Sequence, residues 1–255
     1  KPLGNTIMKK VVFCHGMPGS PSDAELLSKA NPGIEAIALN LLNFDPKAID
    51  ADLCDAIDAA LGETDGECVH VVGFSIGAMA AIKVAASRPN LVGRLTLISP
   101  AAPLFIGDFL PKMAGKPVFE LAMKRPRILR FLTRLQSLLT RFFPETMVKV
   151  LFAKCGPAER VLLEDETFVS VMKKALSESF VQRPAAYLAF ISAYVADWSE
   201  TMSAVQCDVV LWHGTNDTWS PVEMSHSLKG VFGEKARINL VQGAEHYSTL
   251  VQAEL

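Results

Sequence analysis

The sequence lacks the features that would indicate a membrane protein, a disulfide-rich secreted protein or a metalloprotein. No apolar run approaches the ~20 residues that a helix needs to span a bilayer, and no apolar stretch of signal-peptide length precedes the first expected strand. The five cysteines are odd in number and no two have CxxC spacing, which argues against a disulfide framework and a cysteine metal site. We therefore expect a cytoplasmic protein with reduced thiols, no metal and no cofactor.

An excess of charge of either sign is also lacking. The chain has 25 basic and 27 acidic residues and a formal net charge of −2, so we expect no strong general attraction to nucleic acid. Half of its 255 residues are hydrophobic and a fifth are charged, which is typical of a compact globular protein. This length suits one large α/β domain, with or without an insertion. Met8 is a candidate for the natural first residue, which would make residues 1–7 foreign to the protein.

Short apolar segments typical of buried strands alternate with segments of helical periodicity. The expected strands cover residues 9–16, 34–41, 68–74, 93–100, 207–214 and 236–243. The expected helices between them cover residues 45–61, 75–89 and 220–233. Continuous apolar strands separated by helices predict an α/β protein with a mostly parallel sheet flanked by helices on both faces.

This alternation is interrupted between residues 103 and 198, where the pattern is helical throughout. The interruption falls between two expected strands, and no linker of low complexity separates it from them. We therefore expect residues 1–102 and 199–255 to form the core and residues 103–198 to form an inserted helical cap.

The segment Gly73-Phe74-Ser75-Ile76-Gly77 fits the pattern G-x-S-x-G between a strand and a helix. In such a turn the serine adopts a strained backbone conformation, and Gly73 and Gly77 let the strand and the helix approach closely. The alternative is a packing turn that happens to contain serine. The position at a strand–helix junction favours a nucleophile.

A serine hydroxyl needs a general base, and five histidines are available. His246 follows the last expected strand, from where a loop residue can reach the edge of the sheet that carries Ser75. His70 lies within a strand, His213 precedes a loop glycine, and His226 falls in a helical pattern. These positions favour a core role, a loop-shaping role and a surface role respectively, so His246 is the candidate base.

The acid that orients the base should come from the same edge of the sheet. Asp217 directly follows a strand, whereas Asp208 begins that strand at its opposite end and Asp197 lies in the helical insertion. Asp217 is therefore the candidate that would hold the imidazole of His246 in the required tautomer.

An oxyanion hole requires donors aimed at the substrate carbonyl oxygen. The backbone N–H of Ile76, directly after the nucleophile, is one candidate. The second is the Met17 N–H in the loop 14–23, where Gly16 permits close backbone approach. His15 is expected to shape this loop rather than to act as a second base.

Four segments of the chain resemble motifs of the α/β-hydrolase family, in the family's order. They are HGMPGS (15–20), GFSIG (73–77), GTNDTWSP (214–221) and GAEHYS (243–248). The resemblance implies that Ser75, Asp217 and His246 are a catalytic triad and that the insertion is the family's helical cap. The chain departs from the pattern in beginning at the family's third strand, in having NLLNFDP (40–46) in place of a D-x-P-G-x-G loop, and in its short last helix.

The insertion also has the strongest charge asymmetry in the chain. Residues 112–141 contain eight basic residues and one acid, Glu120. The spacing places four arginines on one helical face and apolar residues on another, namely Arg127, Arg130, Arg134 and Arg141, and Leu129, Leu132, Leu135, Leu139 and Phe143. One interpretation is attraction of an anionic or acyl substrate, or contact with a membrane surface. The interpretation we favour is a solvated basic face whose apolar side packs on the core.

These observations predict a carboxylesterase-like serine hydrolase that acts on a small-molecule acyl substrate without a nucleic-acid partner. Amide, thioester and carbon–carbon bonds remain alternatives because the same residues serve their hydrolysis. A second class of alternative is a ligand-binding receptor that keeps the pocket without turnover. The sequence leaves the oligomeric state open.

Overall fold

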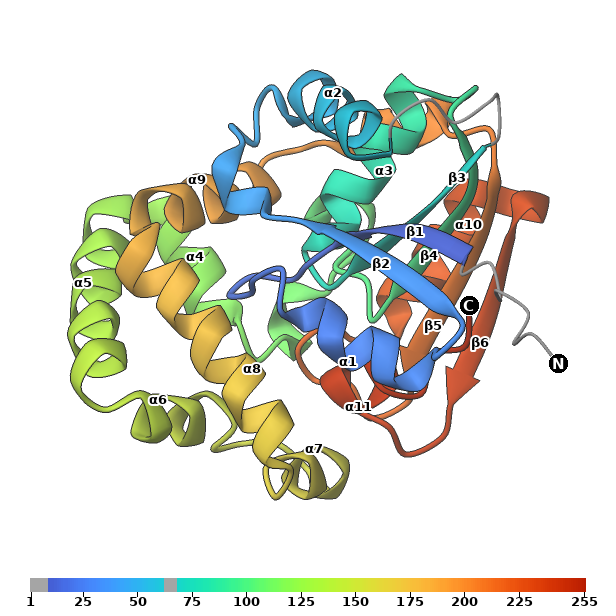
Figure 1. The fold of residues 1–255 in the computed structure, drawn as a ribbon. Helices are drawn as coiled ribbons and strands as arrows, with labels where there is room; N and C mark the ends of the chain where they lie inside the picture. The colour runs from blue at the N-terminus through green and yellow to red at the C-terminus, as the bar shows by residue number, and fades with distance from the viewer. Residues whose placement is uncertain (1–8, 62–67) are drawn as a thin grey trace, which may run out of the picture.

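The computed structural model describes residues 9–61 and 68–255 (Figure 1). The candidate start at Met8 and residues 1–7 lie outside the described residues. Every helix within the described residues is too short or too polar to span a bilayer.

Six strands form a single sheet in the order β2-β1-β3-β4-β5-β6, and every neighbouring pair is parallel. The strands are β1 (Lys9–Cys14), β2 (Ile34–Leu39), β3 (Val69–Phe74), β4 (Val92–Ile98), β5 (Asp208–Gly214) and β6 (Ala236–Val241). Val12 of β1 lies opposite Ile37 of β2 on one side and Val71 of β3 on the other. This sheet confirms the predicted fold class.

Strand β3 is buried along its whole length because other strands flank it and helices cover it. Helices α2 and α3 pack against each other on one face of the sheet, while α1 and α11 lie on the other face (Figure 1). We call residues 103–198, between β4 and β5, the inserted segment. The helices outside it are α1 (Asp23–Ala30), α2 (Ile49–Leu61), α3 (Gly77–Ser87), α10 (Glu223–Phe232) and α11 (His246–Leu250), with 3-10 turns η1 (Leu41–Asn43), η5 (Ser199–Ala204) and η6 (Gly233–Lys235).

Helix α1 was not predicted, because its eight residues give too short a periodic pattern. Its ends nevertheless have the expected charges, with Asp23 and Glu25 in the first turn and Lys29 in the last. These charges complement the helix dipole. Leu26 and Leu27 are its large apolar residues, and both are buried.

The segment between β4 and β5 contains helices and turns but no strand within the described chain. Its elements are η2 (Leu104–Ile106), η3 (Leu110–Lys112), α4 (Lys116–Lys124), α5 (Pro126–Phe142), α6 (Pro144–Leu151), α7 (Pro157–Leu162), α8 (Glu166–Leu176), the π-helical η4 (Ser177–Gln182) and α9 (Pro184–Tyr194). They gather beside the sheet, at the end where the loop after β1 lies (Figure 1).

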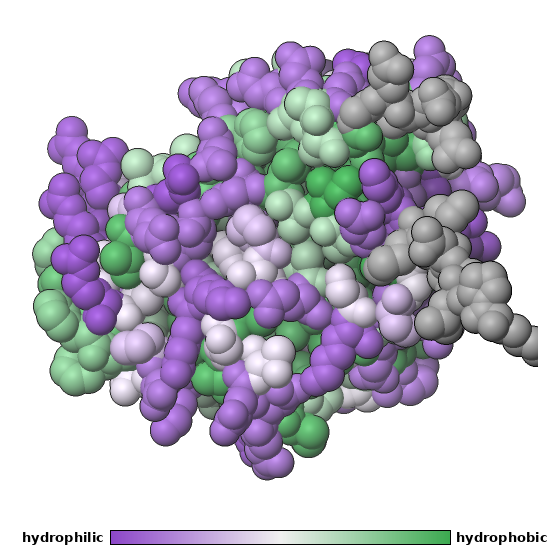
Figure 2. Space-filling view, in the orientation of Figure 1, coloured by the Kyte–Doolittle hydropathy of each residue, from purple (hydrophilic) through white to green (hydrophobic). Residues whose placement is uncertain are grey.

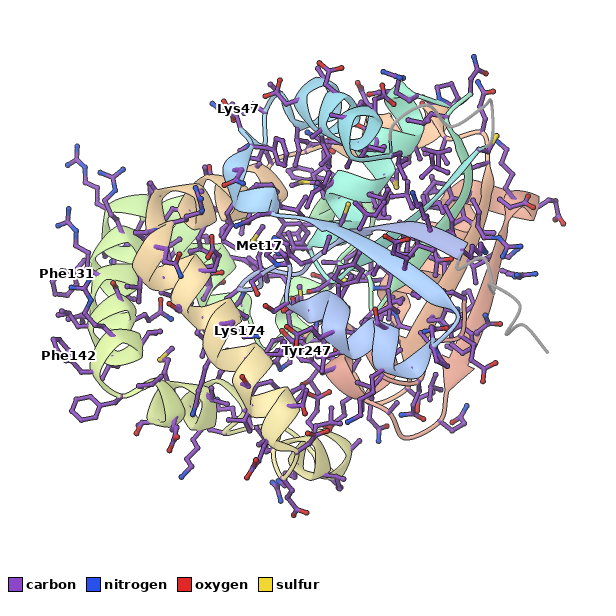
Figure 3. All side chains as sticks on the ribbon, viewed as in Figure 1. Met17, Lys47, Phe131, Phe142, Lys174 and Tyr247 are labelled. Atoms are coloured by element: carbon purple, nitrogen blue, oxygen red, sulfur yellow. The ribbon has the colours of Figure 1, made fainter. Side chains whose placement is uncertain are left out.

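Helix α5 exposes its apolar side instead of burying it. Its buried residues are Leu129, Thr133 and Thr140. We call the exposed apolar side the outer face of α5; it consists of Ile128, Phe131, Leu132, Leu135, Leu138, Leu139 and Phe142. Figure 2 shows apolar surface along the left side of the molecule, where α5 lies. In Figure 3, Phe131 and Phe142 point away from the molecule. The expectation that the apolar side of this helix packs on the core is therefore wrong.

Candidate functional site

Ser75 directly follows β3, in a turn whose backbone conformation an L-residue rarely adopts. Its φ is 55°, in the left-handed region where the Cβ atom is crowded. Its N–H donates to the carbonyl of Ile98 at 3.1 Å, which anchors the turn to β4. A Cβ at Gly73 would lie 2.8 Å from the Ala78 Cα and the Ala81 Cβ, so only glycine allows strand and helix to approach this closely.

The loop after β1 packs directly onto this turn. A Cβ at Gly77 would overlap the carbonyl oxygens of Cys14 and His15. A Cβ at Gly16 would lie 3.1 Å from the Cβ of Ser75. Two glycines, one from each segment, thus let the backbone of the loop reach the serine.

His15, near the start of this loop, is fully buried, and both of its ring nitrogens have partners. Its Nε2 accepts from the N–H of Leu41 at 3.0 Å, so its Nδ1 carries the proton and donates to the carbonyl of Gly16 at 2.9 Å. Burial lowers the pKa of His15 to about 4, which keeps the ring neutral. With both nitrogens bonded, His15 has none left to act as a base.

Met17 and Ile76, the two expected oxyanion donors, border one cavity together with Ser75. Within residues 9–61 and 68–255, neither backbone N–H donates to another protein group. Figure 3 places Met17 where the sheet meets the inserted helices. The two amides are therefore free to donate to a molecule in the cavity.

Asp217 is buried and each of its carboxylate oxygens has a defined role. Oδ1 accepts from the backbone N–H groups of Trp219 at 2.8 Å and Ser220 at 2.9 Å. Oδ2 lies 2.8 Å from Nδ1 of His246. Burial raises the pKa of Asp217, but the charge and hydrogen bond of His246, together with His213 and the Ser220 N–H, hold it below its ordinary value.

His246 is the first residue of α11, so it does not lie in a loop as the sequence suggested. Its ring stacks on Trp219 at a centroid distance of 5.1 Å and also contacts the ring of Phe74 at 4.9 Å. Ser99, another residue with positive φ, donates its hydroxyl to the backbone carbonyl of His246 at 3.0 Å. No hydrogen bond joins the ring to Ser75 among the described residues.

Two glutamates join α7 of the inserted segment to α11. Glu245 accepts from the N–H of Gly156 at 2.5 Å and from that of Glu159 at 2.8 Å. Glu159 in turn accepts from the N–H of Ser248 at 2.9 Å. Burial raises the pKa of Glu159 to about 7. Each carboxylate thus satisfies the free N–H groups at the start of the other's helix.

Of the remaining candidate bases and acids, His213 lies beside Asp217, with its Nε2 3.6 Å from Oδ2, but both of its ring nitrogens have other partners. His70 bonds Thr96 at 2.8 Å, and His213 bonds the Ser225 hydroxyl and the Ser220 carbonyl. His226 and Asp208 are exposed, and Asp197 accepts from Ser199. Among the described residues, no group of three or more His, Cys, Asp or Glu side chains is placed to hold a metal ion.

Sequence reasoning missed several residues that hold Asp217 and His246 in place. Ser99, Trp219, Ser220, Glu159 and Glu245 contact them or their helix through the bonds described above. Trp219 was predictable, because an aspartate side chain commonly accepts from the backbone N–H two residues further along the chain. Glu159 and Glu245 were not, because 86 residues separate them.

The cavity next to Ser75 has a volume of about 190 Å³ and a mostly apolar lining. Apart from Ser75, Met17 and Ile76, its lining comes largely from the inserted segment. These residues are Met113, Ala114, Gly115, Val118, Phe119, Gln136, Leu151, Phe180, Tyr187 and Ile191. The insertion therefore forms the roof of the cavity, and the turns after β1 and β3 form its floor.

Known proteins resemble the chain in sequence and in fold. A sequence model described as the alpha/beta hydrolase family matches residues 11–254. Among curated proteins, none matches the chain.

Many solved structures share the fold at low sequence identity. An alpha/beta hydrolase fold protein from Nakamurella multipartita has a TM-score of 0.65 and 19% identity over 96% of this chain and 87% of its own. A structure from work on carboxylesterases of Nitrososphaera gargenis has a TM-score of 0.62 and 16% identity over 98% and 87%. A thermophilic esterase from Thermogutta terrifontis has a TM-score of 0.62 and 14% identity over 96% and 85%.

Proposed function

Since this chain belongs to the alpha/beta hydrolase family, we propose that it is a serine hydrolase that cleaves an ester or a related acyl bond of a small molecule. The observation that carries the proposal is the 2.8 Å bond from His246 Nδ1 to Asp217 beside the cavity that Ser75 borders. Ser75 is the nucleophile, His246 the general base and Asp217 the group that orients the imidazole.

The bonds of Asp217 explain how the base is prepared. Because Oδ1 already accepts two backbone N–H groups, Oδ2 is directed at Nδ1 of His246 and keeps the proton there. Nε2 is then unprotonated and can accept the serine proton. We expect Ser75 to bond Nε2 once substrate fills the cavity, since catalytic hydrogen bonds commonly tighten on binding.

The reaction proceeds through an acyl-enzyme. Ser75 Oγ attacks the carbonyl carbon while His246 takes the hydroxyl proton, and the oxyanion accepts from the N–H groups of Met17 and Ile76. His246 then protonates the leaving alkoxide, and the acyl group remains on Ser75. Water then attacks the acyl carbon while His246 takes its proton, and His246 passes this proton to Ser75 Oγ as the acid is released.

The cavity favours a small acyl group. Its volume of about 190 Å³ is below the roughly 300 Å³ at which pockets for drug-sized ligands begin. The lining offers apolar contacts and few polar partners. We therefore expect an acyl chain of a few carbon atoms to fit in the cavity beneath the inserted segment, with the leaving group toward the opening.

The test is covalent labelling followed by a substrate panel. A fluorophosphonate probe should label the protein, and Ser75→Ala should abolish labelling while circular dichroism stays unchanged. A folded protein that no fluorophosphonate labels would instead support a ligand-binding receptor without turnover.

Esters of p-nitrophenol with graded acyl length then define the substrate class. We expect the highest kcat/KM for short chains and a loss of activity in Ser75→Ala. Amide, thioester and carbon–carbon substrates should be slower by at least about tenfold; a faster one would redefine the bond that is cleaved.

A further inference from the structure

The outer face of α5 exposes more large apolar surface than the other helices described here. Phe131 is 58% exposed, Leu138 54% and Phe142 67%. Exposed apolar patches of this kind mark sites where a protein meets another surface. The inner side of the helix buries Leu129 and two threonines, Thr133 and Thr140, whose hydroxyls have no hydrogen-bond partner.

The four arginines Arg127, Arg130, Arg134 and Arg141 form a basic stripe beside this face. Their spacing keeps them on one side of the helix, and α5 contains no acidic residue. Among the described residues, none of the four has an ion-pair partner. The chain as a whole is slightly acidic, so this positive charge is local.

We propose that the outer face of α5 docks on the surface of a lipid bilayer that contains anionic headgroups. The apolar side chains enter the boundary between headgroups and acyl chains, and the arginine stripe pairs with the phosphates beside it. A helix that combines an apolar face with a basic flank binds the plane of such a surface.

Charge decides between a bilayer and a second copy of the chain. If two copies met through their α5 helices, they would bring two arginine stripes together, and α5 has no carboxylate to pair with them. A surface of negative charge supplies the missing partner at each arginine. The complementarity thus favours anionic lipid over self-association.

Docking in this way would hold the roof of the cavity against the bilayer. Gln136, on the inner side of α5, borders the same cavity as Ser75. The bilayer would therefore lie across one helix from the cavity, on the side where Phe131 and Phe142 point outward (Figure 3).

Vesicle co-sedimentation of the full chain tests the proposal and needs no turnover. The vesicles contain phosphatidylcholine alone, or equal parts of phosphatidylcholine and phosphatidylglycerol. We expect binding to the second kind, weaker at high salt, and at least about tenfold less binding to the first. Equal binding to both kinds, or to neither, overturns the proposal.

Two triple variants, each with a matched control, test the residues. Arg127→Glu with Arg130→Glu and Arg134→Glu should weaken binding at least about tenfold, whereas the same reversal at Lys10, Lys47 and Arg237, which are exposed elsewhere, should not.

The apolar residues need their own variant because charge alone would give salt-sensitive binding without insertion. Serine at Phe131, Leu135 and Leu138 should also weaken binding about tenfold. Serine at the exposed Val161, Val231 and Leu240 should leave it unchanged. If the first serine variant binds like the wild type, the outer face does not insert and the proposal fails.

Sedimentation velocity without lipid and hydrolysis of a soluble ester complete the test. A monomer that hydrolyses the ester in every variant shows that the variants are folded and that docking is separable from turnover. A dimer that the Phe131, Leu135 and Leu138 variant dissociates, with no vesicle binding by the wild type, would assign the face to a second copy and overturn the proposal.

Discussion

Helices α3 and α5 differ in the burial of their apolar residues: α3 buries them, whereas α5 exposes most of them. Helix α3 buries eight of its eleven residues, between the sheet and α2. Helix α5 buries three of its seventeen residues, and two of those three are threonines. Both have apolar residues at helical spacing, so periodicity alone does not say which way an apolar face points.

The difference follows from what surrounds each helix. The small residues of α3 let it lie close to β3, where Gly73 faces Ala78 and Ala81. Helix α5 lies at the outer edge of the inserted segment, where few elements remain to cover it (Figure 1). Mutations near α3 should therefore change chemistry or stability, whereas mutations on the outer face of α5 should change neither.

The largest expected effect concerns the site at the start of α3. In Asp217→Asn the amide carbonyl should keep the two backbone N–H groups that Oδ1 accepts, so the NH2 group would face Nδ1 of His246. The imidazole proton would then move to Nε2, which could no longer accept the serine proton. We expect kcat/KM for a soluble ester to fall by about 10³ to 10⁴.

Asp208→Asn is the matched control, because Asp208 begins the strand that Asp217 follows and is exposed. Its activity should remain within about twofold of the wild type, as expected for a surface substitution. Near-normal activity in Asp217→Asn would mean that another carboxylate orients the base.

Next in size is the packing of α3 itself. Ile82 is fully buried in this helix, and Ile82→Ala removes buried carbon atoms and leaves a cavity. We expect the free energy of unfolding to fall by about 2 to 5 kcal/mol, measured by urea denaturation. A loss below about 1 kcal/mol would mean that α3 can move to fill the space.

A smaller effect concerns the contact between α7 and α11. The pKa of Glu159 is raised from 4.5 to about 7 in the folded protein. Between these pH values the folded protein holds a proton that the unfolded chain has released, so the contribution of Glu159 to stability falls as pH rises through this range. Glu159→Gln should remain neutral and still accept the Ser248 N–H.

Urea denaturation at pH 5 and pH 8 measures this difference. Relative to the wild type, Glu159→Gln should gain about 2 kcal/mol of stability between pH 5 and pH 8. Glu164→Gln, at an exposed position nearby, should show no such gain. A stability difference that is the same at both pH values would show that Glu159 keeps one protonation state.

The smallest effect is expected on the outer face of α5. Leu138 is 54% exposed, so Leu138→Ser should change the free energy of unfolding by less than about 0.5 kcal/mol. The same urea titration that measures Ile82→Ala gives the comparison. A loss of 2 kcal/mol or more would show that the outer face is covered in solution and would remove the contrast between the two helices.

The sheet and the order of the candidate residues were predictable from the sequence because both depend on local patterns. Apolar runs between helical segments predicted all six strands. Turns after parallel strands share one edge of a sheet, which brought Ser75, Asp217 and His246 into consideration together. Helix α1 was not predicted from the sequence, because a helix of eight residues has too few apolar positions to show a period.

Other features depend on contacts that no local pattern encodes. Ser99 donates to the carbonyl of His246 across 147 positions of the chain. Glu245 accepts from N–H groups at the start of α7, and Glu159 accepts from one at the start of α11. These bonds form only because the inserted segment folds back onto α11. The placement of His246 at the first position of a helix was hidden for the same reason.

By itself, the sequence determined the α/β class, the positions of the strands and the small residues that the turn at Ser75 needs. These follow from periodicity and from backbone sterics, which act over a few residues. Only the tertiary structure decided which face of α5 is buried and which side chains surround the cavity. Both depend on how the inserted helices pack on one another, and an amphipathic pattern states that a helix has two faces without stating which of them meets the protein.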